Sequence, residues 1–424
     1  ASGNQDKFTL SMWIKRANIS TDHPRLFTSV AGGNDRFEVY FENTDELHIE
    51  GVDNGTATLN LVTSAKFRDV SAWYHILLAV DTGQGTEANR AKLYINGVLI
   101  TAFGTSTRPD QNGNIGINTN SFPLQIGERS GYGVDFDGYL AEIVLLDGTQ
   151  AANTDFGEFD DSGIWKPIDV EGLSSSKGNN GFYLDFEASG NLGNDVNGGT
   201  DLTEVNLAAT DQSTDTCINN FATMNPLDNF YAESTFSEGN LNLVMADSPN
   251  TWNTSTIGVS SGKWYFEVKE LAEGASGSSQ VGVADRPTVA AAEELGGIAT
   301  SFAYTSNGRF RTGNSQTAAD KATWGVNDVI GIALDMDASP ATVTFTKNGS
   351  AAGSTQNLTA TGTGFYFLAI GAWVDGSVTF SANFGSPAYS ESGGNSDGDG
   401  HGNFSMAVPS GYFALNTKNL AEYG

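Results

Sequence analysis

The sequence predicts an all-β protein built from antiparallel β-sandwiches. Short stretches in which apolar and polar residues alternate recur along the chain, as in Lys7–Lys15. Asn-Gly and Asp-Gly pairs, which tolerate the positive φ values of tight hairpin turns, separate many of these stretches. Glycine is abundant, with 51 residues against 10 prolines, which suits short strands joined by turns. We therefore predict two antiparallel sandwiches of jelly-roll type in tandem, joined by an irregular connector.

Two hairpins carry the clearest strand signal. In the first, a strand ending at Asp81 is followed by a polar loop, and Lys92–Ile95 then runs into Asn96-Gly97. In the second, a strand ending at Asp335 is followed by a polar loop, and Val343 and Phe345 alternate with threonines before Asn348-Gly349. Asn-Gly favours a type I′ turn because both residues accept positive φ. Each hairpin predicts one sandwich.

The first domain is predicted over residues 1–150. Its further expected strands are Arg25–Val30, Phe37–Phe41, Glu46–Glu50, Thr58–Val62, Pro123–Gly127 and the buried strand within Phe136–Asp147. The segments TLSMWIKR, WYHILLAVD, AKLYINGVLI, LQIGER and FDGYLAEIVLLDG resemble, in this order, a laminin-G or concanavalin-A-like jelly roll. That family has a strand before the segment equivalent to Lys7–Lys15. We therefore expect the first strand to be missing from this sequence or supplied by a neighbouring chain.

Residues 151–235 are predicted to form the connector. They are rich in Asn, Asp, Gly and Thr, and one strand, Phe182–Phe186, is expected to pack back on the first sandwich. Three islands, at 156–167, 181–186 and 219–223, resemble sequences that join laminin-G-like to SPRY-like domains in virion surface proteins of marine bacteriophages. This resemblance implies a viral, fibre-type protein.

The second domain is predicted over residues 236–390. Within Ser260–Lys269, the side chains of Trp264, Phe266 and Val268 fall on one face. The segments GKWYFEV, VGVAD, GVNDVIGIALD, VTFTKNG and NFG are similar, in order, to a SPRY (B30.2) domain. Residues 391–424 are expected to form a flexible Gly- and Asp-rich loop followed by a short ordered terminus.

Charge restricts the classes of partner. The formal charge is −29, from 50 acidic and 21 basic residues, so the chain is expected to repel phosphate backbones and anionic lipid headgroups. We therefore expect no nucleic-acid partner. We also expect no membrane insertion, because no run of about 18 apolar residues occurs. A saline or marine setting, or bound divalent cations, would fit this charge. Cys217 is the only cysteine, so no intrachain disulfide is expected.

Sequence motifs give no support for catalysis. Gly258–Gly262 satisfies G-x-S-x-G, but a strand follows it where a nucleophile elbow requires a helix, so we expect a turn. His75 lies in a predicted strand beside aromatic residues and is expected to be structural. Carboxylate pairs such as Asp160-Asp161 and Glu293-Glu294 are too numerous to indicate glycoside hydrolysis. We identify no acidic cluster that alternates with aromatic residues along one strand, as a sugar cleft on this fold would favour. We therefore expect a protein that is not an enzyme.

Two groups of oxygen ligands are candidates for calcium. Asn395, Asp397 and Asp399 alternate in a glycine-rich run that resembles the first half of a calcium loop, although Met406 replaces its bidentate glutamate. The alternative is a solvated acidic linker. The second group follows from the laminin-G-like resemblance, whose sandwiches bind calcium at a rim, and consists of Asp135, Asp137 and Asp147.

The loops at the sandwich rims are the expected binding surface, because loops carry recognition on a rigid β-scaffold. In the SPRY-like half, the candidate ligand-binding residues lie at predicted strand ends or loops. They are Asp285, Arg286, Arg309, Arg311, Trp324, Trp373 and Asp375. Tryptophan and arginine are enriched at interface hot spots, and aromatic rings stack on sugars. Trp373, Trp13 and Trp264 are also candidates for the cores.

Together these observations predict a non-catalytic virion surface protein of a marine phage, located outside the cell. It would act as a fibre or host-recognition component that binds a host glycan or protein and contacts other virion subunits. Two alternatives stay open: a secreted or cell-surface bacterial adhesin, and a structural decoration or assembly protein that contacts only other virion subunits. Phage fibres are commonly homotrimers, so a homo-oligomer is also expected, but the chain shows no heptad repeat.

Overall fold

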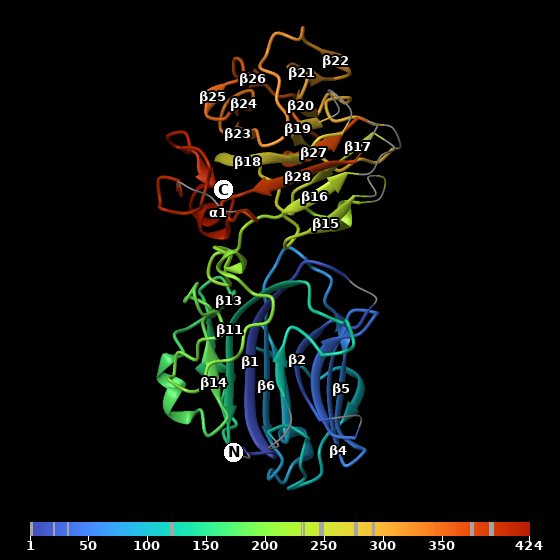
Figure 1. Cartoon of the computed structure of the whole chain (residues 1–424), viewed down its shortest axis with the longest axis vertical. Helices are drawn as coiled ribbons and strands as arrows, with labels where there is room; N and C mark the ends of the chain where they lie inside the picture. The colour runs from blue at the N-terminus through green and yellow to red at the C-terminus, as the bar shows by residue number, and fades with distance from the viewer. Residues whose placement is uncertain are drawn as a thin grey trace. The chain divides into compact units, whose positions relative to one another are not determined.

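The computed structural model describes the chain except for residues 1–2, 20–21, 32–33, 119–122, 230, 232–233, 246–249, 275–278, 291–292, 374–376 and 390–393 and the side chains of 174–176. It forms two compact units, Ala1–Gln212 and Ser213–Gly424 (Figure 1). The predicted all-β architecture of antiparallel sandwiches is confirmed. The helices of the described residues are short: η1 (Glu87–Asn89), η2 (Asn153–Asp155), η3 (Glu171–Ser176), η4 (Ala209–Asp211), η5 (Pro226–Asp228) and α1 (Thr417–Tyr423). None of them has the length and apolar character needed to cross a bilayer.

The first unit is a sandwich of two six-stranded sheets. Sheet A has the order β14 (Phe182–Leu184), β11 (Gly138–Asp147), β1 (Lys7–Arg16), β6 (Tyr74–Asp81), β7 (Ala91–Ile95) and β8 (Val98–Leu99). Sheet B has the order β10 (Leu124–Ile126), β2 (Arg25–Val30), β3 (Arg36–Phe41), β4 (Glu46–Asp53), β5 (Thr56–Lys66) and β9 (Phe103–Thr107). Alternate side chains, such as Phe8 and Leu10 of β1 and Phe37 and Val39 of β3, fill the core between the sheets.

An irregular segment, residues 151–211, covers the outer face of sheet A. Phe156, Val170 and Tyr183 pack there on Leu77 and Val144. The predicted returning strand is confirmed as β14, which pairs with β11, and the segment also contains a small hairpin of β12 (Gly157–Phe159) and β13 (Trp165–Pro167). The segment predicted as the connector, 151–235, is divided between the two units: residues up to Gln212 belong to the first and residues from Ser213 onward to the second.

The side chain of His75 binds the covering segment to sheet A. It lies on β6 with no exposed surface, its ring stacks on Trp13 at 4.8 Å between centroids, and Trp165 Nε1 donates to its Nδ1 at 3.0 Å. Indole N–H can only donate, so Nδ1 accepts, and the ring proton sits on Nε2 and points to Ser11 Oγ at 2.8 Å. His75 therefore cannot take a proton from Ser11, and the expected structural role of His75 is confirmed.

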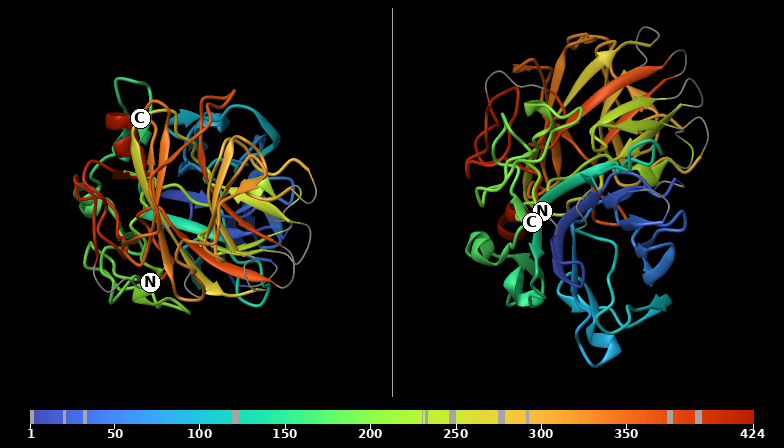
Figure 2. Two further views of the ribbon diagram at one scale, coloured as in Figure 1. Left: turned by 90° about the horizontal axis from the view of Figure 1, so that it is seen from above. Right: turned by 60° about the horizontal axis from the view of Figure 1, so that its bottom comes forward.

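The second unit is also a two-sheet sandwich, seen from above in Figure 2. Sheet C has the order β15 (Thr235–Ser237), β16 (Asn242–Met245), β28 (Val378–Asn383), β18 (Lys263–Ala272), β23 (Val329–Asp335), β24 (Thr342–Lys347) and β25 (Ser350–Ala351), with β26 (Gln356–Asn357) on β24 and β29 (Phe413–Ala414) on β18. Sheet D has the order β17 (Thr251–Thr254), β27 (Phe367–Ala372), β19 (Ser279–Ala284), β20 (Ser301–Thr305), β21 (Arg309–Thr312) and β22 (Ser315–Gln316). Trp264, Phe266 and Val268 lie in the core, as predicted.

The C-terminal residues 394–424 cover the outer face of sheet C. Phe404 and Ala414 pack on Tyr265 and Ala333, which alternation alone would leave in water. Glu267 fixes this cover: its carboxylate accepts the backbone N–H groups of Ser405 at 2.8 Å and Met406 at 2.9 Å. Burial raises the pKa of Glu267, partly offset by these donors. The expected flexible loop is thus, over its described residues, a packed part of the second unit.

Both predicted Asn-Gly hairpin turns are present. Asn96 and Gly97 have φ values of 47° and 75°, and Asn348 and Gly349 have φ values of 48° and 78°. Positive φ at both central residues is the requirement of a type I′ turn. The two turns fix the pairing of β7 with β8 and of β24 with β25.

The buried state of His75 predicts a pH dependence of stability. Burial lowers its pKa to about 3, against 6.5 in an unfolded chain, so the folded state requires the neutral ring. This contribution is complete above pH 6.5 and is lost as pH falls toward 3, at about 1.4 kcal/mol per pH unit. Between pH 7 and pH 5, wild type should lose about 2 kcal/mol more unfolding free energy than the His75→Phe variant, measured by urea titration. Equal losses in the two proteins would contradict this assignment.

Candidate functional site

Charged and aromatic side chains gather on the outer face of sheet B. Because Phe37, Val39 and Phe41 point into the core, the intervening residues of β3 point outward, and the same alternation applies to β4. We call this surface the arginine–glutamate face. It consists of Arg25, Arg36, Glu38, Tyr40, Glu42, His48, Glu50 and Arg129.

Three arginines converge on Glu38. Its side chain is 1% exposed, Arg25 Nε donates to Oε1 at 3.1 Å, and Arg129 Nη1 reaches both oxygens at 3.1 Å. Arg36 lies 3.3 Å from Oε2 and also binds Glu50 through two parallel hydrogen bonds of 2.9 and 2.8 Å. Burial works to lower the pKa of Arg36, but the bonds to Glu50 outweigh it and raise the pKa. Each guanidinium is thus held in a fixed orientation.

Planar rings lie beside these ion pairs. The guanidinium of Arg25 lies over the ring of Tyr40 at 3.9 Å, and the rings of Tyr40 and His48 are 4.6 Å apart. Glu42 joins two histidines, with His48 Nδ1 at 2.6 Å and His23 Nε2 at 3.2 Å. Burial, followed by the charge of Glu42, raises the pKa of Tyr40, so its hydroxyl stays protonated as a donor.

The face offers exposed groups as well as supporting ones. Arg36, Glu50 and Glu42 keep 17–24% of their side chains exposed, whereas Glu38 is covered. Tyr132 is 63% exposed and its ring lies on the guanidinium of Arg129 at 3.8 Å. Fixed donors and acceptors beside aromatic rings are the groups that bind the hydroxyls and apolar faces of sugars. Both carboxylate oxygens of Glu38 bind guanidinium groups, so neither oxygen is available to act as a general acid on a glycosidic oxygen.

Our sequence-based expectation that no acidic cluster alternates with aromatic residues on one strand is wrong. Glu38, Tyr40 and Glu42 alternate along and just beyond β3, opposite His48 and Glu50 of β4. The signal is present in the printed sequence as EVYFE and HIE. Each strand alone shows only part of this group, which is complete only when β3 pairs with β4.

Three predicted rim residues of the second unit come together but are paired internally. Arg286 binds Glu293 at 2.8 Å, Arg311 forms an ion pair with Glu294, and Asp285 accepts from Thr300 Oγ1 at 2.9 Å. These bonds hold residues 285–290 and 293–300 on the outer face of sheet D. Asp285, Arg286 and Arg311 therefore support that segment and do not form a binding surface that is ready for a ligand.

The other predicted residues of the second unit lie apart from this group. Arg309 donates to the carbonyl of Thr317 at 2.9 Å, and Trp324 is buried beside Tyr304. Trp373 is 45% exposed because β27 ends one residue earlier. It lies beside the start of β19, whereas Asp285 follows the end of β19. Asp375 lies outside the described residues. The expected core positions of Trp13 and Trp264 are confirmed.

The calcium group expected at the rim of the first sandwich is not brought together. Asp135 and Asp137 are exposed and lie just before β11, whereas Asp147 is its last residue. A strand of ten residues is about 30 Å long, so the three carboxylates cannot share one ion. Asp147 is buried and accepts hydrogen bonds from the backbone of Asn4 and Asn180. Among the described residues no three His, Cys, Asp or Glu side chains are placed to hold a metal ion.

The calcium group expected in the glycine-rich C-terminal run has a structural role. Asp397 is buried, its Oδ1 accepts the N–H groups of Asp399 and His401, and its Oδ2 accepts Ala414 N and Asn419 Nδ2. Asn395 binds the carbonyls of Phe404 and Ser405 through its amide group. Carboxylate oxygens that already accept four protein donors fasten the C-terminal cover and do not need a cation.

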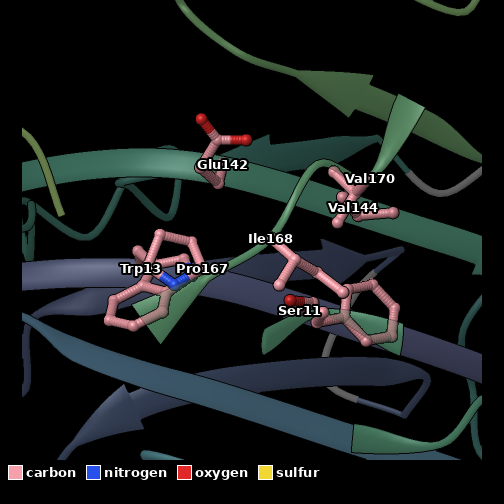
Figure 3. A pocket seen from close by; sticks show the side chains of 8 residues that line it. Ser11, Trp13, Glu142, Val144, Pro167, Ile168 and Val170 are labelled. Carbon is pink, nitrogen blue, oxygen red and sulfur yellow. The ribbon is translucent and has the colours of Figure 1, made fainter. Parts of the chain in front are cut away.

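A small pocket lies between sheet A and its covering segment (Figure 3). Trp13 and Pro167 line one side, and Val144 and Val170 line the other. Its volume is about 10 Å³, the space of a single water molecule. Near it, Glu142 accepts the hydroxyl of Tyr183 at 2.5 Å, and burial raises the pKa of Glu142. This pocket is too small to be the binding site of a sugar.

The G-x-S-x-G segment is a turn, as predicted. Gly262 has φ of +81° and its N–H donates to Asp337 Oδ1 at 2.8 Å, and β18 begins at the next residue. A strand rather than a helix therefore follows Ser260, whose side chain is exposed.

Comparison with known families agrees with the two sandwiches. Residues 1–152 match the concanavalin A-like lectin/glucanases superfamily, and residues 263–386 match the SPRY domain. The laminin-G/concanavalin-A-like and SPRY resemblances are thus confirmed, and the chain has the domains of a binding module. None of these matches is to a phage protein, so the viral role stays a proposal. No curated protein sequence matches the chain.

Solved structures with similar parts share low identity with this chain. The SPRY domain of human HERC1 is 16% identical, with 38% of this chain and 96% of that one covered and a TM-score of 0.32. Another human SPRY domain is 20% identical, with 33% and 91% covered and a TM-score of 0.27. The heptameric SAP-like pentraxin of Limulus polyphemus is 17% identical, with 34% and 65% covered and a TM-score of 0.24.

The Asp397 assignment predicts a destabilised C-terminal cover in the Asp397→Ala variant. Four donors would lose their acceptor, so the free energy of unfolding of the second unit should fall by at least about 2 kcal/mol. Urea unfolding and limited proteolysis within residues 394–424 would measure this. The matched control is Asp399→Ala, which alters an exposed carboxylate of the same loop. A melting temperature that drops in chelator would instead support a calcium site.

Proposed function

We propose that this chain is a non-catalytic host-recognition component on the virion surface of a marine phage, and that its first unit binds a host glycan on the arginine–glutamate face. The observation that carries the glycan assignment is the set of fixed guanidinium–carboxylate pairs beside Tyr40 and His48. Family membership supports a binding module, and the sequence resemblance of the connector supports the viral role.

The dimensions of the face favour an extended glycan. A polar row crosses all six strands in register, and consists of Gln125, Thr28, Glu38, Glu50, Asn60 and Thr107. Five strand spacings give a length of about 24 Å, enough for an oligosaccharide. Thr28 and Glu38 are buried in this row, so a glycan along it would contact Gln125, Glu50, Asn60 and Thr107.

The charge balance of the face is compatible with neutral glycans and with glycans that carry a few acidic groups. Arg25, Arg36 and Arg129 are matched by Glu38, Glu42 and Glu50, whereas the chain as a whole carries −29. The face is therefore less acidic than the average surface, and bacterial surface glycans that carry acidic groups are repelled less here than elsewhere.

Removal of one exposed pair should weaken glycan binding. Arg36→Ala would delete two hydrogen bonds to Glu50 and one donor group of the face, so the Kd for a glycan identified on an array should rise at least about 10-fold. Isothermal titration calorimetry would measure it. The matched control is Arg286→Ala, which breaks a similar bidentate Arg–Glu pair in the second unit. Equal affinities of the Arg36→Ala variant and wild type would overturn the proposed site.

Binding assays, the neighbouring genes and a hydrolysis assay separate the proposed function from its alternatives. A decoration or assembly protein would bind no glycan and no host surface extract, and would bind purified virion subunits only. An adhesin would bind glycans but would be encoded away from tail or capsid genes. Tail or capsid genes beside the gene for this chain would support the virion assignment. Release of reducing ends from a polysaccharide panel would contradict a non-catalytic role.

A further inference from the structure

One side of the first sandwich ends in an open sheet edge. β8 is the terminal strand of sheet A and β9 is the terminal strand of sheet B among the described strands. The chain runs directly from one to the other, so residues 98–107 form the free edge of both sheets. Among the described strands, β8 pairs only with β7 and β9 pairs only with β5. Figure 1 labels β5.

Neither charge nor proline protects this edge, although β8 has only two residues and the β5–β9 pairing has an irregularity at Val62/Thr63. Residues 96–107 contain no ionisable side chain and no proline. Val98 and Leu99 are 57% and 44% exposed, and every residue of β9 after Phe103 is exposed. Native proteins protect free edges with charges, proline, bulges or covering segments, because unpaired backbone N–H and C=O groups are templates for another strand.

The opposite edge of sheet A shows such protection. All three residues of β14 are buried. Tyr183 N donates to Asp195 Oδ1 at 3.0 Å, and Val196 N donates to the carbonyl of Tyr183 at 3.0 Å. The chain therefore caps one edge with its own backbone and a carboxylate. At the other edge Asn153 Nδ2 donates to the carbonyl of Gly97 in the turn before β8, but β8 and β9 stay terminal among the described strands.

We propose that the β8–β9 edge pairs antiparallel with the same edge of a second copy of this chain, which gives a two-fold symmetric dimer. The occupant must be a strand that is itself unpaired and uncharged, and this edge meets both conditions for its own copy. Two chains of charge −29 repel each other over most of their surface. The nearest ionisable neighbour on the C-terminal side is basic: Arg108, whose guanidinium lies 5.3 Å from the ring of Phe103. Pairing along this edge therefore joins segments that themselves carry no acidic side chain.

The dimer is tested by sedimentation of the full chain over a range of micromolar concentrations. The wild type should reach twice the chain mass of 44.7 kDa. The double variant Thr105→Lys, Thr107→Lys on β9 should raise the dimer Kd at least about 10-fold, because like charges opposite each other in a pair of strands repel. Both side chains are exposed, so the monomer should keep its fold, checked by thermal melting.

The matched control is Ser350→Lys, an exposed position of β25 in the second unit, which should leave the dimer intact. A wild type that stays monomeric at the highest concentration would overturn the proposal. An oligomer whose mass is unaffected by the two lysines would overturn it as well, because its contacts would lie elsewhere. Neither outcome bears on glycan binding by the arginine–glutamate face, so the two proposals fail independently.

Discussion

A buried polar side chain on the outer face of one sheet fixes the irregular part of each unit. His75 accepts from Trp165, and Glu267 accepts from Ser405 and Met406. Left without these partners in a covered position, either group would cost about 1–3 kcal/mol or more. The segments 151–211 and 394–424 therefore lie where they satisfy these two residues, and their aromatic side chains close the sheet faces around them.

Closure of these faces determines where binding can occur. The outer faces of sheets A and C are occupied by the protein's own segments. Residues 285–290 and 293–300 lie on sheet D, held by Arg286 and Arg311. Sheet B differs, since its outer face carries the arginine–glutamate pairs with no comparable apolar cover among the described residues. A rigid sheet supports these side chains better than a loop would, because alternation fixes their direction.

The strands were predictable, and the covering segments and the face were not. Alternation in β1 and β18 and the Asn-Gly turns gave correct strands because they depend on neighbouring residues only. Asp397 looked like a calcium ligand because its four donors come from residues up to 22 positions away. Glu38 and Glu50 become a site only when β3 and β4 pair.

Hydrogen–deuterium exchange of the full chain, with and without a bound host glycan, tests the central claim most directly. If the arginine–glutamate face binds the glycan, the amides of β3 and β4, residues 36–41 and 46–53, should exchange more slowly in the complex. The strands of the second unit should be unchanged. Slower exchange confined to the second unit, with no change in β3 and β4, would contradict the account.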